Sequence, residues 1–154
     1  MPTFSGVNHI SITVRDMDKS LEFYRDMVGL KVLADISVDE RPDHPKVQYR
    51  GNHAKRRFAT LDTGGGPVLA LISHPGDDLA GDAILLDDVG ITHFAFTVTD
   101  LKQFIEEMVK KGAEPAGPGF FFDPDGILVQ FEEPGEAEAI MAKYKKRIKS
   151  EAGS

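Results

Sequence analysis

The sequence predicts an α+β fold made of two copies of one β-α-β-β-β module. The main observation is an internal repeat: the segment from His9 to Asp16 returns 84 residues later as the segment from His93 to Asp100, with the same Thr-Val pair inside it. In both copies a period-two apolar pattern gives way to a helical pattern directly after the aspartate. The offset exceeds the roughly 20 to 50 residues of a solenoid unit, so two facing modules explain it best.

The composition is that of an ordinary globular domain and argues against several function classes. The chain has 154 residues, enough for one domain with its own core, and we treat residues 1–154 as a single domain. A formal net charge of −7 argues against nucleic acid or an anionic membrane as a partner. The chain has no cysteine, which excludes disulfides, thiolate metal sites and cysteine nucleophiles. With no signal-peptide pattern and no apolar run of membrane length, we expect a cytoplasmic protein.

Residues 7–14 are predicted to form the first strand, because apolar and polar residues alternate and many are β-branched. In that register Ile10, Ile12 and Val14 share one apolar face, which we expect to pack on a helix. His9 lies on the opposite face, since side chains alternate across a strand.

A helix is predicted directly after this strand, capped by Asp16 or Asp18 and ended by Gly29. Its apolar positions recur at helical spacing: Met17, Leu21, Tyr24 and Val28. The first module, residues 5–74, is completed by strands at 31–38, 56–62 and 67–73. The polar segment 39–55 contains two prolines, and we expect it to form a lid or a loop that contacts substrate.

An acidic linker, residues 75–89, leads into the second module, residues 90–134. Asp100 is predicted to cap a strongly amphipathic helix that Gly112 ends. The second module is also predicted to contain a strand at 91–98, an irregular Gly- and Pro-rich segment at 113–119, short strands at 120–122 and 127–132, and a tight turn at 123–126 with no catalytic role. The C-terminal segment 135–150 is predicted to be a helix with a weak apolar stripe.

Four motifs together resemble the vicinal oxygen chelate superfamily, which includes glyoxalase I, extradiol dioxygenases and the bleomycin resistance proteins. The motifs are Asn8-His9, Ser20-Leu21-Glu22-Phe23-Tyr24 with Gly29-Leu30, Thr92-His93, and Phe122-Asp123-Pro124-Asp125-Gly126. The resemblance covers about residues 5 to 135 and is specific for fold rather than for one reaction. It implies that the modules form a half-barrel cleft around a divalent metal (Fe, Mn, Ni or Zn), in a protein that forms a homodimer.

The same resemblance carries the metal-ligand positions onto His9, Ala70, His93 and Gln130. Ala70 has no ligating atom, and Gln130 stands where extradiol dioxygenases use Glu. Two imidazoles and an amide leave the charge of a divalent cation uncompensated, which lowers affinity. Glu132 shares the face of Gln130 about 7 Å further along an ideal strand, and we keep it as a fourth candidate ligand.

The segment 39–55 supplies the catalytic candidates, because it is rich in cations and imidazoles in an otherwise acidic protein. We expect His53 to act as a general acid or base, since the pKa of an imidazole lies near neutral pH, and Tyr49 to assist it. The alternative is that these are solvated loop residues.

The leading functional hypothesis is a metal-dependent enzyme acting on a small vicinal-oxygen substrate, dioxygenase-like more than glyoxalase-like. The alternative is a metal-free protein that binds a small molecule or sequesters an antibiotic. A third hypothesis is an interaction module that uses the C-terminal helix. The expected partners are a small-molecule substrate and a second copy of the chain, with neither nucleic acid nor membrane involved.

Overall fold

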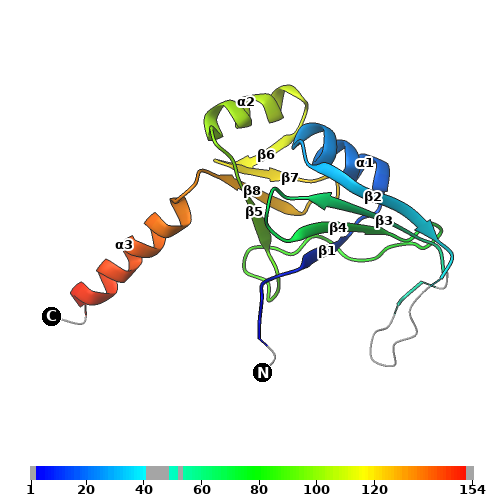
Figure 1. Ribbon diagram of the computed structural model, residues 1–154, viewed down its shortest axis with the longest axis horizontal. Coiled ribbons are helices and arrows are strands. Elements are labelled where there is room, and N and C mark those ends of the chain that lie inside the picture. Colours follow the sequence, from blue (N-terminus) through cyan, green and yellow to red (C-terminus); the bar gives the residue numbers. More distant parts are fainter. Residues whose placement is uncertain (1–2, 41–48, 52–53, 152–154) are drawn as a thin grey trace.

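A computed structural model describes residues 3–40, 49–51 and 54–151 of the chain, with side chains described as far as Lys145. The first four strands form one mixed sheet in the order β1-β4-β3-β2 (Figure 1). Strands β1 and β4 are parallel and the other neighbours are antiparallel. The strands are β1 (His9–Thr13), β2 (Lys31–Val38), β3 (Arg56–Asp62) and β4 (Val68–Ser73).

The last four strands repeat this arrangement in a second sheet, with the order β5-β8-β7-β6 and a parallel β5–β8 pair. They are β5 (His93–Thr97), β6 (Glu114–Gly117), β7 (Phe120–Phe122) and β8 (Leu128–Glu132). The identical strand orders confirm the predicted fold class, an α+β fold with two β-α-β-β-β modules and a C-terminal helix.

The helices begin and end where the repeated signals predict. Asp16 and Asp100 cap the helices α1 (Met17–Leu21) and α2 (Leu101–Lys110) by accepting hydrogen bonds from backbone N–H groups of the first turn. Gly29 and Gly112, which follow these helical segments, both have φ of +93°, a value that favours glycine. The first helix continues as a π-helix, η1 (Glu22–Met27), which was not predicted. The C-terminal helix is α3 (Glu136–Glu151). No described helix is long and apolar enough to cross a membrane.

Strand β6 corrects the sequence analysis, which assigned residues 113–119 to an irregular segment. Pro115 and Gly117 are poor strand residues, but β6 is the edge strand of its sheet and pairs only with β7. An edge position tolerates a proline because one side of the strand needs no ladder hydrogen bonds. Sequence reasoning noted the Gly and Pro residues here but did not identify the edge strand.

The two sheets share one hydrophobic core with the helices. Val14, Leu61 and Leu71 come from the first module, and Phe121 and Phe131 come from the second. Helix η1 also reaches across the boundary, since the ring of Tyr24 stacks on that of Phe94 in β5 at 6.4 Å between centroids. The relative position of the modules is therefore fixed by packing as well as by the chain connection.

A buried hydrogen bond joins the modules at the centre of this core. Tyr24 is fully buried, and its hydroxyl donates to Oδ2 of Asp123 at 2.8 Å. Oδ1 of the same carboxylate accepts from the N–H groups of Asp125 (2.9 Å) and Ile127 (2.8 Å). Burial raises the pKa of both Tyr24 and Asp123. The turn at 123–126 is present as predicted, but its first residue also holds the two modules together.

Two basic side chains add links around this central bond. Arg15, just after β1, donates from its guanidinium to Asp125 at 3.1 Å and from another guanidinium nitrogen to the carbonyl oxygen of Gly81. Lys111, just after α2, donates to the carbonyl oxygens of Asp26 and Met27 at 3.1 and 2.9 Å. The first link also anchors the linker between the modules.

We predict that Tyr24→Phe lowers the free energy of unfolding by about 1 to 3 kcal/mol, because it removes the hydroxyl donor to a buried carboxylate while keeping the ring. Urea unfolding at neutral pH measures the change. The control is Tyr144→Phe, since Tyr144 is 55% exposed and should change stability by less than about 0.5 kcal/mol. Equal effects of the two variants would contradict a structural role for the Tyr24–Asp123 bond.

We also predict a pH dependence of stability that originates from Asp123. As pH rises from about 4 to 7, the free energy of unfolding of the original protein should fall relative to that of the Asp123→Asn variant. Burial raises the folded-state pKa of Asp123 above its unfolded value. Below the unfolded value the carboxyl is protonated in both states, whereas above the folded value the folded state bears the cost of a buried charge. Parallel urea titrations of both proteins across this range measure the difference. The prediction would be contradicted if the free energy of unfolding of the original protein rose with pH relative to that of Asp123→Asn. That result would show that the hydrogen bonds to the Asp123 carboxylate stabilise it by more than its burial costs.

Candidate functional site

His9 lies on the face of the first sheet that points away from the shared core. The strand exposes His9, Ser11 and Thr13, while Ile10 and Ile12 are half-buried on the other face. In the parallel β1–β4 register Ser11 is paired with Ala70, so Ala70 lies on the same face as His9. This agrees with the predicted strand register and defines the first open face.

His93, Gln130 and Glu132 share the corresponding open face of the second sheet. In the β5–β8 register His93 is paired with Leu128, and Gln130 and Glu132 follow at alternate positions along β8. These side chains are half-buried, whereas Phe131, between Gln130 and Glu132, is buried in the core. The ring of His93 also contacts that of Phe120 at 5.8 Å between centroids. The second open face therefore combines an imidazole, an amide and a carboxylate.

The two histidines are held in matching ways by the residues that precede them. Nδ1 of His9 lies 2.8 Å from Oδ1 of Asn8, and Nδ1 of His93 lies 3.0 Å from the hydroxyl oxygen of Thr92. An amide oxygen only accepts, so Nδ1 of His9 is the donor and the lone pair is on Nε2. A histidine that binds a metal through one ring nitrogen usually donates from the other in this way.

The donor types fit a divalent transition metal, but the charge of the set is low. Imidazole, amide and carboxylate groups are all accepted by iron, manganese and zinc. Ala70, on the first open face, supplies no donor. The imidazoles and the Gln130 amide are neutral ligands, so Glu132 is the only anionic member of the candidate set. In the described part of the chain no three His, Cys, Asp or Glu side chains already lie close enough to hold a metal ion.

The catalytic candidates fall in or next to segments that the structure leaves undescribed. His53 lies outside the described residues. Tyr49 is described and half-buried, and its ring lies 5.7 Å from that of His74, directly after β4. Because β1 and β4 run parallel with His9 opposite Val68, this position lies about 20 Å along the sheet from His9. The roles of Tyr49 and His53 stay predictions.

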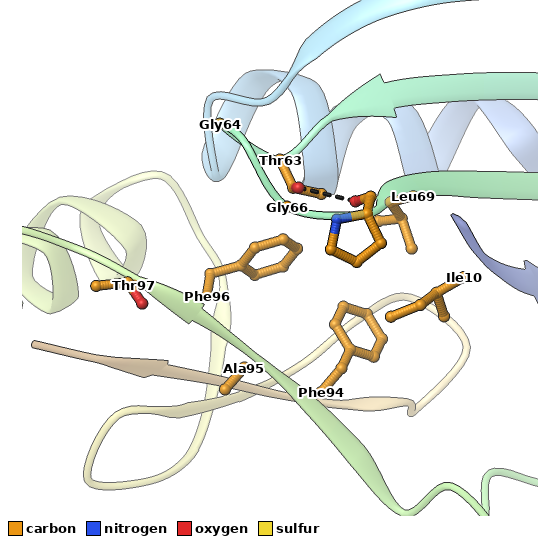
Figure 2. Close-up of a pocket in the computed structure, with 10 residues that line it drawn as sticks. Ile10, Thr63, Gly64, Gly66, Leu69, Phe94, Ala95, Phe96 and Thr97 are labelled. Atoms are coloured by element: carbon orange, nitrogen blue, oxygen red, sulfur yellow. Dashed lines mark hydrogen bonds between the residues drawn. The ribbon is translucent and has the colours of Figure 1, made fainter. Parts of the chain in front are cut away.

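Two of the cavities that the described residues line between the modules border β5; sequence reasoning predicted a cleft between the modules but did not identify the apolar residues that line these two. One, of about 280 Å³, is lined by Pro67 and Leu69 of the first module and by Phe94 and Phe96, which point from β5 toward the first module (Figure 2). The other, of about 240 Å³, includes His93 in its wall together with Asp82, Ala83 and Ile84 of the linker. The apolar face of the first strand was expected to pack on a helix, whereas Ile10 of that face lines both cavities together with Phe94 of β5.

The chain consists of two paired modules with the same strand order, each with a histidine at the start of its first strand, and this defines a class of two-module proteins. A model of the Glyoxalase/Bleomycin resistance protein/Dioxygenase superfamily matches residues 6–131, and the chain belongs to this superfamily. A curated relative, the uncharacterized protein YwkD of Bacillus subtilis (strain 168), is 28% identical over 138 residues, covering 83% of this chain and 96% of YwkD.

Solved structures share the fold at lower identity. The trypanothione-dependent glyoxalase I of Leishmania major is 22% identical with a TM-score of 0.66, over 98% of this chain and 100% of that one. A Glu-to-Gln variant of the fosfomycin resistance protein FosX from Listeria monocytogenes, complexed with Mn(II) and 1S,2S-dihydroxypropylphosphonic acid, is 19% identical with a TM-score of 0.54, over 85% of this chain and 93% of that one. These likenesses show the fold.

We predict that His9 is mainly the Nδ1–H tautomer when neutral, and that Asn8→Ala shifts it toward the Nε2–H form, because the amide oxygen that holds the Nδ1 proton is lost. ¹⁵N NMR of the imidazole nitrogens reports the tautomer directly. His93 in the same sample is the internal control and should not change. Identical His9 spectra in the two proteins would contradict the orienting role of Asn8.

Proposed function

We propose that the protein is a metal-dependent enzyme of its superfamily that acts on a small substrate with two adjacent oxygen atoms. The observation that carries the proposal is the matched pair of histidines, each with Nδ1 engaged by the preceding side chain. For His9 this arrangement places the free lone pair on Nε2, the state in which a neutral imidazole binds a metal.

The proposed ligands are His9, His93 and Gln130, with Glu132 as the anionic member of the set. When bound, a divalent cation such as iron, manganese, nickel or zinc supplies Lewis acidity toward the substrate oxygens. The Gln130 amide can both donate and accept a hydrogen bond, so it suits the orientation of a substrate oxygen. The FosX variant solved with Mn(II) supports this choice, since it shows that the fold accommodates such a cation.

The remaining parts of the proposal concern the reaction type and the assembly. Three of the four ligand positions implied by the resemblance carry a donor (His9, His93 and Gln130), which favours dioxygenase-like over glyoxalase-like chemistry. His53 with Tyr49 would serve in proton transfer. The chain would act as one domain, since both sheets contribute to one core, and as a homodimer.

A metal-free binding protein is the second candidate, and the chemistry of one position favours it. Ala70 is 8% exposed and gives the first open face an apolar floor beside Ser11. With Gln130 also neutral, both last-strand positions lack the carboxylate that would compensate a cation. Such surfaces suit a small organic ligand that is sequestered without reaction.

We predict that protein purified without chelators or a His tag contains close to one equivalent of a transition metal per chain, and that His9→Ala and His93→Ala each lower it severalfold. Elemental analysis by plasma mass spectrometry measures the content, and the double variant should retain none. His74→Ala is the matched control, since His74 is outside the proposed set. A metal-free protein that also takes up no metal on titration would support the metal-free candidate.

Gln130→Glu separates the two candidates further in the same assay. It adds the missing negative charge, so metal affinity should rise by about tenfold or more if Gln130 is a ligand. Phe120 faces the same position from β7, and its apolar ring would disfavour the new carboxylate if no cation were bound. Unchanged metal affinity with lower stability would therefore count against Gln130 as a ligand.

A further inference from the structure

The C-terminal helix α3 presents an apolar face that no described residue of its own chain covers. Every described side chain of α3, from Glu136 to Lys145, is exposed, and in Figure 1 the helix projects away from both sheets. Ile140, Met141 and Tyr144 lie on one face at helical spacing and are 51, 57 and 55% exposed. Most of the stability of a helix in a protein comes from packing of its apolar face, so a partner for this face is expected.

The linker between the modules carries a second exposed apolar surface, which we call the linker strip (residues 84–91). All its residues are exposed, and it includes five large aliphatic side chains: Ile84, Leu85, Leu86, Val89 and Ile91. Contiguous exposed apolar surface of this kind usually marks an interaction site.

The linker strip is a built surface rather than a loose chain. Arg15 donates to the carbonyl oxygen of Gly81 and so holds the start of this segment against the core. The residues 85–88 form a turn in which the N–H of Asp88 donates to the carbonyl oxygen of Leu85 (3.1 Å), while the N–H of Leu85 donates to the Asp88 carboxylate (2.9 Å). These bonds fix the backbone that displays the neighbouring aliphatic side chains.

The two surfaces have opposite charge. The linker strip contains Asp87 and Asp88 and follows three further Asp in residues 75–83, with neither Lys nor Arg in residues 75–91. In α3 the described basic side chains are Lys143 and Lys145, which begin a stretch (residues 143–149) whose sequence is basic. This basic run stands out in a chain of net charge −7. Apolar surface combined with opposite charge is the pattern expected of two surfaces that bind each other.

We propose that α3 of one copy of the chain packs on the linker strip of a second copy, and that the second copy returns the same contact. Such an exchange is symmetric and closed, so it gives a dimer rather than a filament. The proposed dimer does not depend on metal binding or on any activity. The exchanged contact brings the apolar side chains of α3 onto those of the linker strip and the Lys and Arg residues next to the Asp residues.

A charge exchange between two variants tests the proposal. One variant carries Lys143→Glu and Lys145→Glu in α3, and the other carries Asp82→Lys and Asp87→Lys in the linker segment. Each variant alone faces like charges in its own dimer, so its dimer should dissociate with a constant at least about tenfold higher than that of the original protein. An equimolar mixture has opposite charges at both contacts and should recover the dimer. Sedimentation velocity over a wide range of concentrations measures this.

A matched pair of substitutions on α2 distinguishes this contact from a general effect of surface charge. Lys102→Glu with Lys110→Glu gives the same change in net charge at exposed positions elsewhere and should leave the dimer intact. If the mixed variants stay monomeric, the proposal is overturned. That result would indicate that α3 packs on the linker of its own chain or on an unrelated protein. An original protein that is monomeric at every concentration would overturn it too.

A covalent trap provides a second measurement that is independent of charge. The chain has no cysteine, so Leu86→Cys and Tyr144→Cys each introduce a single thiol. A mixture of the two variants can form only the mixed disulfide or the two homodimeric disulfides. Under a mild thiol oxidant the mixed pair should form a disulfide-linked heterodimer in high yield. Leu86→Cys with Val109→Cys, an exposed position on α2, is the control. Equal yields from the two mixtures would show random collision and reject the contact.

Discussion

The hydrogen bond from Tyr24 to Asp123 is the constraint on which the arrangement of the two modules depends. A phenol and a carboxylate taken out of water must find partners, and each of them supplies one for the other across the module boundary. The carboxylate also holds the turn before β8, since it accepts from Asp125 and Ile127. One buried group therefore fixes both the shape of the second module and its position against the first helix. Any other relative placement would leave this pair partly unsatisfied.

That constraint explains why the candidate ligands lie on the sheet faces opposite the apolar core. Once the apolar faces of both sheets are committed to one core, strand alternation sends His9 and His93 to the opposite faces. Asn8 and Thr92 then orient the two imidazoles from the preceding position of each repeat. In both copies of the internal repeat, the residue before the histidine contacts Nδ1 of its ring. This shared contact is the main argument for the proposal that the two histidines bind a metal ion.

Local patterns predicted most of this fold, and the exceptions have physical causes. The aspartate caps, the glycine stops and β2 and β3 were predictable because they depend on short-range rules. Strand β6 was missed because its Pro115 is tolerated only at an edge, which is a property of the assembled sheet. The partnership of Tyr24 with Asp123 joins residues 99 positions apart, and Tyr24 fits an ordinary apolar helix position. The faces of His9, His93 and Gln130 were predictable from alternation, whereas their function depends on a ligand that the sequence does not name.

The linker connects the core to both of the functional surfaces inferred for this protein. Arg15 joins it to Asp125, next to the buried Asp123, so the position of the linker follows from the same turn that Tyr24 holds. One part of it, around Asp82 to Ile84, forms a wall of the cavity that contains His93. The linker strip, which shares Ile84 and Ile91 with the lining of that cavity, displays the apolar side chains proposed to receive α3. A partner bound to the linker strip would therefore limit the movement of one wall of the His93 cavity, because both surfaces belong to the same anchored segment.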